Sequence, residues 1–366
     1  MSIKRVEIND FLVFKGEFTS DFCPGVNVLI GSNGTGKTTL LKILYWACEF
    51  ADKSEFEKQN GNLRLVTDNI SHYSIPFFLQ SYYNGDNSPL SHSDNISQHL
   101  SAIRVIGFDN DIGTPALTVN FPESLEAINL KIGNKFSTSS RESALWCDRN
   151  LNSVFIPTAE MLSHSRGLLA LSRERKIPFD KTELDIIAKA ELEPTHEITE
   201  NASNILKKIT KIIGGTVSYD GKDFFIQKSP NNKIQFSFEA SGYRKLGLLW
   251  RLLRNGLLEP GSILFWDEPE NSLNPELLSI LVDILLELSR KGIQIFIATH
   301  SEILASYFAV NRQEGDHVLF ISLYKDGGQV KTNINDRFDL LNPNNLRAEP
   351  IKLYEKEIVK GLNFYG

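Results

Sequence analysis

The stretch that most constrains this chain is GVNVLIGSNGTGKTTLLKILY, near the start of its 366 residues. It contains a complete G-x-x-x-x-G-K-T pattern from Gly31 to Thr38, after a short β-branched apolar run and before a helical apolar periodicity. An apolar strand that passes through a glycine loop directly into an amphipathic helix predicts an α/β fold with this strand inside the sheet. The core face of the helix is predicted to carry Leu40, Leu41, Leu44, Ala47 and Cys48.

The glycine loop has the chemistry of a phosphate-binding site. Glycines let backbone N–H groups turn inward around phosphate oxygens, where a Cβ atom would clash. The helix N-terminus adds about half a positive charge. Lys37 supplies a mobile point charge, and the Thr38 hydroxyl is a ligand for Mg²⁺. The predicted nucleotide-binding residues are Gly31, Ser32, Asn33, Gly34, Thr35, Gly36, Lys37, Thr38 and Thr39.

Two carboxylates follow a second apolar strand, in SILFWDEPENSLNP. Asp267 can reach the Mg²⁺ of a nucleotide held by the first loop, and Glu268 suits a general base that polarises the attacking water. The alternative is a pair of surface acids that cap the helix beginning near Pro275. His300 follows the next apolar strand, IQIFIAT, at the edge where parallel sheets bind ligands, although a lone histidine is more often structural.

The remaining chain suggests two lobes with insertions, because 366 residues exceed the ~250–300 at which single cores stop growing. Residues 50–150 are polar and predict an irregular β-rich insertion. Charged helical patterning over residues 159–213 predicts an exposed helical arm or lid. After two expected hairpins, strands and helices alternate, which favours a mainly parallel sheet. We therefore divide the chain into a first lobe (1–158), the helical arm (159–213) and a second lobe (214–366).

Composition excludes several classes of protein. The net charge of −6 argues against a protein that coats nucleic acid through its global charge. The three cysteines, Cys23, Cys48 and Cys147, have no metal-site spacing and predict neither structural zinc nor a disulfide framework. The N-terminus lacks the apolar core of a signal peptide, and no apolar run approaches 18 residues, so we expect a cytoplasmic protein without a membrane segment.

The set GSNGTGKT, ASGYRKL, ILFWDEPENSLNP and ATHS resembles the ABC-type ATPase heads, within them the SMC-like and OLD-like AAA branch. SVFIPTAEMLSH is similar to a segment of the compact AAA-type ATPases of bacterial anti-phage defence systems. The resemblance covers roughly residues 1–50 and 153–325. It implies an α/β, ABC-ATPase-like head with a mainly parallel core sheet, an N-terminal antiparallel β-rich lobe and an inserted helical arm.

The resemblance also implies roles for individual residues in binding ATP and Mg²⁺. Lys37, Glu268 and His300 would be catalytic, with Glu268 as the base and His300 as the switch contacting the γ-phosphate. Asp267 and Thr38 would bind the metal, with Glu160 or Gln80 in the position that senses it. Ser241 and Gly242 would form the signature loop, which completes the partner's phosphate loop in a head-to-tail homodimer that buries two ATP molecules. Ser272 to Asn274 would form the D-loop, with Asn274 among the nucleotide-binding residues.

The sequence leaves open which molecule such an ATPase head acts on. The ATPase would gate a separately encoded effector, a nuclease or toxin, in anti-phage defence. A DNA-binding repair or chromosome-maintenance ATPase would use the basic residues of the helical arm, unless these form only a solvated face. These are the residues from Ser172 to Lys176 with Lys207, Lys208 and Lys211. A nucleotide-gated scaffold with negligible hydrolysis is a third reading. A transporter subunit is disfavoured by the short ASGYRKL signature.

Overall fold

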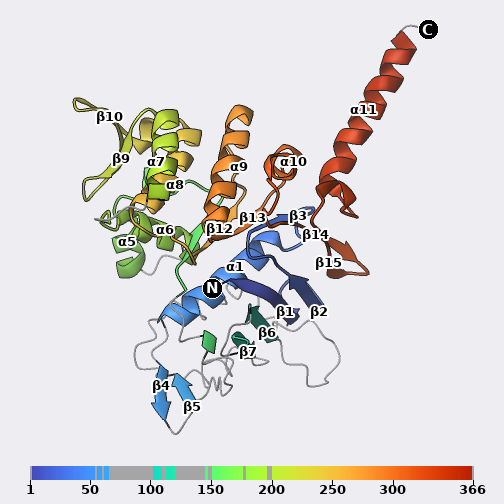
Figure 1. Cartoon of the computed structure of the whole chain (residues 1–366), viewed down its shortest axis with the longest axis horizontal. Helices are drawn as coiled ribbons and strands as arrows, with labels where there is room; N and C mark the ends of the chain where they lie inside the picture. Colours follow the sequence, from blue (N-terminus) through green and yellow to red (C-terminus); the bar gives the residue numbers. More distant parts are fainter. Residues whose placement is uncertain are drawn as a thin grey trace.

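The computed structural model describes residues 2–53, 56–59, 62–65, 102–108, 113–120, 145–146, 151–175, 179–195 and 200–364. Gln80 and Cys147 lie outside these ranges. Figure 1 shows a central sheet with helices packed along it and a second sheet below it. Among the residues described, no helix combines the length and the apolar character that crossing a membrane requires.

The central sheet has six strands in the order β15-β14-β3-β13-β12-β8. All neighbours are parallel except the edge strand β15, which runs antiparallel to β14. The middle strands are short and buried along their whole length, as expected for parallel strands covered on both faces. Their bounds are β3 Val26–Ile30, β8 Ser153–Ile156, β12 Ile263–Asp267, β13 Gln294–Ala298, β14 Val318–Asp326 and β15 Gln329–Asn335.

Two hydrophobic cores lie on opposite faces of this sheet. In β3, Val26, Val28 and Ile30 belong to the core formed with the later helices, whereas Leu29 belongs to the core formed with α1 and the N-terminal strands. The alternation follows the two-residue period of a strand. The helices involved are α1 (Lys37–Lys53), α8 (Ser241–Arg254), α9 (Pro275–Arg290) and α10 (Glu302–Asn311).

Three smaller sheets surround the central one. The N-terminal antiparallel sheet has the order β2-β1-β6-β7, and a meander has the order β11-β10-β9. Together with the mainly parallel core sheet, they confirm the predicted fold class. The strands are β1 Ile3–Phe11, β2 Phe14–Asp21, β6 Ala102–Gly107, β7 Ala116–Asn120, β9 Thr216–Tyr219, β10 Phe224–Ser229, β11 Asn232–Gln235, and the pair β4 Phe56–Gln59 and β5 Asn62–Leu65.

The helices inserted between β8 and β9 are packed more deeply than the charged sequence predicted. They are α5 (Leu168–Arg175), α6 (Lys181–Glu191) and α7 (Glu200–Ile213). α6 buries Ile186 and Ile187 in the core that the central sheet forms with the later helices, and α7 packs along α8. The segment is an insertion, as predicted, but α6 and α7 expose only their outer faces.

The last helix, α11 (Asn345–Phe364), extends away from the body (Figure 1). Its first turn stays attached, because Asn345 Nδ2 donates a hydrogen bond of 2.9 Å to Ser32 Oγ in the glycine loop. Beyond Pro350 its apolar residues Ile351, Tyr354 and Ile358 are exposed.

Candidate active site

The glycine loop is closed on both sides by neighbouring backbone and side chains. Gly31 and Gly36 have φ values of 147° and 90°, in the region that favours glycine. A Cβ atom at Gly31 would lie 2.2 Å from the Leu323 carbonyl oxygen, and one at Gly36 would lie 2.6 Å from Val13 Cγ2. Both glycines are therefore required by conformation and by space.

Lys37 points back into this loop. Its ammonium group donates to the carbonyl oxygens of Gly31, at 2.7 Å, and Ser32, at 3.2 Å. Burial lowers the pKa of Lys37, and the charges of Asp267 and Glu268 oppose that shift. A cation is thus held at the centre of the loop, where the oxygens of a bound phosphate could replace the carbonyl acceptors.

Thr38 joins the loop to the carboxylate strand. Its hydroxyl lies 3.1 Å from Asp267 Oδ1 and 3.0 Å from Oδ2, although the two residues are 229 positions apart. Thr158 Oγ1 also donates to Asp267 Oδ2, at 3.0 Å. Converging hydroxyl and carboxylate oxygens suit Mg²⁺, which is typically bound by few protein ligands together with substrate phosphates and water.

Glu268 and His300 come from the ends of adjacent strands. His300 Nε2 lies 3.6 Å from Glu268 Oε1, and both side chains are about one-third exposed. Glu268 has a φ of 48°, which is unusual for a non-glycine residue. Glu270 fixes the β13 end, because its Oε1 accepts hydrogen bonds from Thr299 Oγ1 at 2.7 Å and the His300 amide at 2.8 Å.

The predicted signature loop lies against the predicted D-loop of the same chain. Ser241, the first residue of α8, donates from Oγ to the Ser272 carbonyl oxygen at 3.3 Å. A Cβ atom at Gly242 would lie 3.2 Å from Leu273 Cδ2, so the two loops are closely packed. The Asn274 side chain caps α9 by accepting from the Glu276 amide.

Sequence reasoning missed Lys245, one turn after Ser241. Its side chain is buried, with 3% exposure, and its ammonium donates to the Glu268 carbonyl oxygen at 3.1 Å. Burial lowers the pKa of Lys245 to about 8, against the opposing charges of Glu270, Glu268, Asp267 and Glu160. A lysine four residues after a helix-starting serine was the available signal, since positions i and i+4 share one helical face.

The Glu160 carboxylate is engaged in local contacts. Its Oε1 accepts from the amides of Leu162, at 2.6 Å, and Ser163, at 3.2 Å, at the start of a short 3-10 turn. Its Oε2 lies 3.4 Å from Arg244 Nη1. In this segment it is Thr158, two residues earlier, that contacts Asp267. The metal-sensing role of Glu160 stays a prediction.

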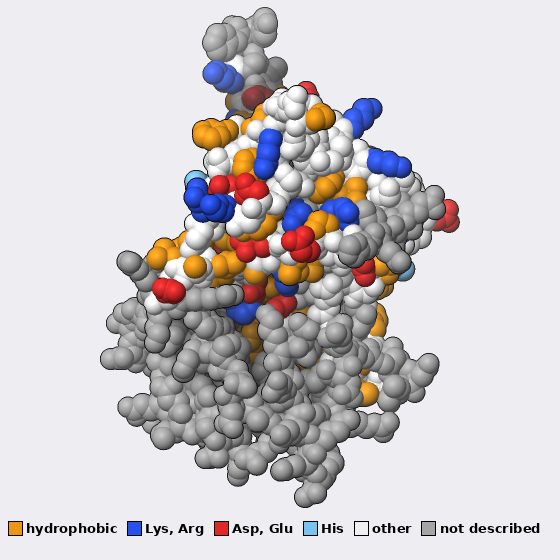
Figure 2. All heavy atoms as spheres, turned by 90° about the vertical axis from the view of Figure 1, so that its left-hand side faces the viewer, with side chains coloured by type: hydrophobic (Ala, Val, Ile, Leu, Met, Phe, Trp, Pro, Cys, Tyr) orange, Lys and Arg blue, Asp and Glu red, His pale blue; other side chains and the backbone are white. Residues whose placement is uncertain are grey.

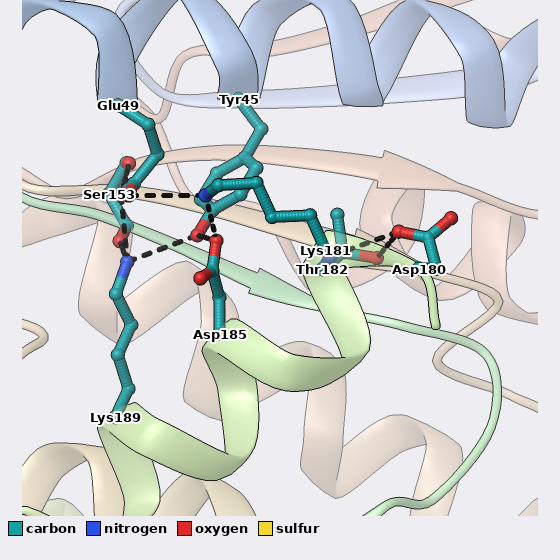
Figure 3. Close-up of polar contacts among 8 residues, drawn as sticks. All are labelled: Tyr45, Glu49, Ser153, Asp180, Lys181, Thr182, Asp185 and Lys189. Carbon is teal, nitrogen blue, oxygen red and sulfur yellow. Dashed lines mark hydrogen bonds and ion pairs between the residues drawn. The ribbon is translucent and has the colours of Figure 1, made fainter. Parts of the chain in front are cut away.

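A cluster of charges attaches α6 to α1, the helix that follows the glycine loop (Figure 3). Lys189 of α6 donates to Glu49 Oε1 at 2.9 Å, and Asp185 accepts from the Tyr45 hydroxyl at 3.0 Å. Burial, with the nearby Glu49 charge, raises the pKa of Tyr45. Lys42 of α1 pairs with Asp180, the residue that caps α6. Helix α6 is therefore fixed to α1, the helix that follows the glycine loop.

The predicted basic face of the insertion carries both signs of charge. Lys207, Lys208 and Lys211 are exposed on α7, and Lys208 pairs with Glu287 at 2.5 Å. Figure 2 views the side of the molecule where α5 to α8 lie and shows Lys and Arg side chains interspersed with Asp and Glu. The nucleic-acid hypothesis stays a prediction.

Two family models match the chain. One, described as "AAA ATPase domain", matches residues 1–155 and includes the glycine loop. The other, described as "AAA domain, putative AbiEii toxin, Type IV TA system", matches residues 163–306 and includes the carboxylate strand and His300. No curated protein matches the sequence.

Similar solved structures are SMC head domains. An SMC head bound to the C-terminal winged-helix domain of ScpA has a TM-score of 0.54 at 13% identity, covering 92% of this chain and 98% of that chain. The SMC head from Thermotoga maritima has a TM-score of 0.49 at 13% identity, covering 91% and 98%. A ScpA-bound head with an extended coiled coil, derived from Pyrococcus furiosus, has a TM-score of 0.48 at 11% identity, covering 97% and 98%.

The likeness to SMC heads concerns the fold alone at these identities, whereas the family matches concern the sequence. AAA ATPase models cover both halves of the chain, and the fold places the glycine loop of the first half against the carboxylate strand of the second. AAA-family ATPase models thus match two successive segments of this chain, and its fold is that of an SMC-like ATPase head.

Proposed function

We propose that this protein binds and hydrolyses ATP with Mg²⁺ as a head-to-tail homodimer, with two ATP molecules at the interface. The observation that carries the proposal is the 3.0 Å contact between Thr38 Oγ1 and Asp267 Oδ2. It brings the phosphate loop and the carboxylate strand together in one site, as metal-assisted phosphoryl transfer requires.

The residues around this contact divide the chemistry among them. Lys37, with the backbone amides of residues 31–39, would bind the phosphate oxygens. Thr38 and Asp267 would hold Mg²⁺, which when bound neutralises charge on the phosphate oxygens. Glu268 would take a proton from the attacking water, and His300 would orient the γ-phosphate beside it.

The dimer would be completed by the start of α8. Ser241 and the amides of Gly242 and Tyr243 offer donors and the positive end of a fourteen-residue helix. In a two-fold head-to-tail arrangement, each protomer would present this helix start to the γ-phosphate held by its partner. ATP would bridge the protomers, and hydrolysis would remove the bridge.

The test of hydrolysis is phosphate release by the purified protein with Mg-ATP, compared with Glu268→Gln. We expect the variant to lose about 10²–10⁴-fold in rate, because it keeps the site's shape but removes the base. It should also accumulate as an ATP-bound dimer in light scattering. Glu314→Gln, an exposed glutamate beyond α10, is the matched control and should behave as wild type. If the wild-type protein released no phosphate, a nucleotide-gated scaffold with negligible hydrolysis would be favoured instead.

We further propose that ATP state gates a separately encoded effector, a nuclease or toxin, in anti-phage defence. The description of the second family model, which names a toxin of a toxin–antitoxin system, supports this setting. Affinity capture from the native host with wild type and with Glu268→Gln tests the idea. An effector enriched by the trapped variant is expected, and equal recovery with both proteins would contradict gating.

A further inference from the structure

The backbone of Glu268 is held from two sides. Its amide donates to the Ala298 carbonyl oxygen of β13 at 2.8 Å, and its carbonyl oxygen accepts from two donors, Lys245 Nζ at 3.1 Å and the Asn271 amide at 3.1 Å, of which only Lys245 comes from outside the loop. Between these bonds the residue has a φ of 48°. A non-glycine residue in this conformation costs about 1–3 kcal/mol and persists only where the surroundings fix it.

We propose that Lys245 is a positioning residue for hydrolysis: its bond to the Glu268 carbonyl holds the left-handed backbone that directs the Glu268 carboxylate toward His300. The inference rests on the proposed function, because it assigns Lys245 to the same reaction. The side chain of Lys245 is buried, and its ammonium contacts the backbone of Glu268. It acts through the peptide group of Glu268.

The position of Lys245 on α8 gives this contact a second consequence. Ser241 and Lys245 lie one turn apart on the same face of α8. Ser241 contacts the Ser272 carbonyl oxygen, and Lys245 contacts the Glu268 carbonyl oxygen. The helix start that would bind the partner's γ-phosphate is therefore joined at two points to the loop that carries the catalytic carboxylate. Engagement of one nucleotide would set the geometry of the base at the other.

A purely structural role for Lys245 predicts different behaviour. Arg251 is a matched control on the same helix: it is also buried, with 5% exposure, and its guanidinium donates to the carbonyl oxygens of Ala190 and Leu192 at 2.8 and 2.9 Å. Those carbonyls belong to the end of α6 and the residue after it, away from Glu268. Replacing either Lys245 or Arg251 by methionine removes a buried cation that donates to backbone carbonyl oxygens. Only Lys245 donates to the backbone of Glu268, the proposed base.

The experiment compares steady-state ATP hydrolysis by wild type, Lys245→Met, Lys245→Arg and Arg251→Met. We expect Lys245→Met to lower kcat by about tenfold to 100-fold, the size of effect caused by a base displaced by about 1 Å. KM for ATP should stay within about twofold, because the phosphate loop is untouched. Lys245→Arg, which keeps a charged donor, should recover part of kcat. Arg251→Met should lower the melting temperature while kcat stays near wild type.

A second measurement separates positioning from binding and folding. Lys245→Met combined with Glu268→Gln should still form the ATP-trapped dimer, since the base is already inactive in that background. Loss of this dimer, or an unchanged kcat in Lys245→Met, would overturn the positioning role while leaving the proposed function standing. A wild-type protein without phosphate release would overturn the proposed function itself, and this inference with it.

Discussion

Lys189 is the residue whose loss most directly tests the contact between α6 and α1, the helix that follows the glycine loop. Its ammonium donates to Glu49 Oε1 at 2.9 Å, to the Tyr45 hydroxyl at 3.2 Å and to the Ser153 carbonyl oxygen. Glu49 is buried, with 6% exposure. Lys189→Met keeps an unbranched, slightly shorter side chain and removes the cation nearest to that carboxylate.

The magnitude follows from what remains around Glu49. Breaking a buried ion pair by removing one partner costs about 3–5 kcal/mol. Here Lys181 Nζ stays 3.8 Å from Glu49 Oε2, and Ser153 Oγ still donates to Oε1 at 3.1 Å. We therefore expect a loss of about 2–3 kcal/mol in the free energy of unfolding, and a Tm lower by about 3–4 °C.

Thermal unfolding at neutral pH without nucleotide is the assay, with a double-mutant cycle. Lys189→Met with Glu49→Gln should recover most of the loss, because the isolated buried charge causes it. Lys352→Met breaks an exposed pair with Glu349 and should change stability by less than about 0.5 kcal/mol. If Lys189→Met were as stable as this control, or if the double variant recovered nothing, the electrostatic reasoning would be refuted.

Three further predictions concern the nucleotide site. Gly36→Ala should lower stability in thermal unfolding more than Gly328→Ala does. Both glycines have similar positive φ values, but only the new Cβ atom at position 36 would clash with Val13. Equal losses would contradict the steric argument. Ser241→Arg should keep ATP binding to the monomer and abolish dimerisation and hydrolysis, and normal phosphate release would refute its role. The pKa of Lys245 is lowered from 10.5 to about 8 in the folded state, so between pH 8 and 10.5 the unfolded chain binds more protons than the folded chain. Wild type should therefore gain about 3 kcal/mol of stability relative to Lys245→Met as the pH rises through that window. Denaturant unfolding without metal measures this difference.

The strands and helices of the central sheet could be predicted because their signals are local. The run before Gly31 and the run before Asp267 are apolar throughout, and both lie in the buried parallel sheet. The adjacency of β3, β13 and β12 then brings their carboxyl ends to one edge. Thr38 and Asp267 meet there because of the topology, which the alternation of strands and helices had indicated.

The parts that sequence missed depend on partners distant in the chain. The spacing of Lys245 from Ser241 places both on one face of α8, but it does not show that Lys245 is buried against the carbonyl oxygen of Glu268. The exposure predicted for residues 159–213 was too large because charged residues such as Lys189 find buried partners on α1. A charge is costly to bury unless it is paired, and the pairing is visible only in three dimensions.

The strand order also has a consequence for how the protein is made. β3, from the first thirty residues, lies between β13 and β14, and Asn27 reaches the Ile295 carbonyl oxygen across a separation of 268 residues. At about 5–20 residues per second, a ribosome needs on the order of tens of seconds between making β3 and making its two neighbours. During that interval the phosphate loop has no sheet to hold it. A nascent chain would therefore acquire its nucleotide site late in synthesis, once both flanking strands have emerged.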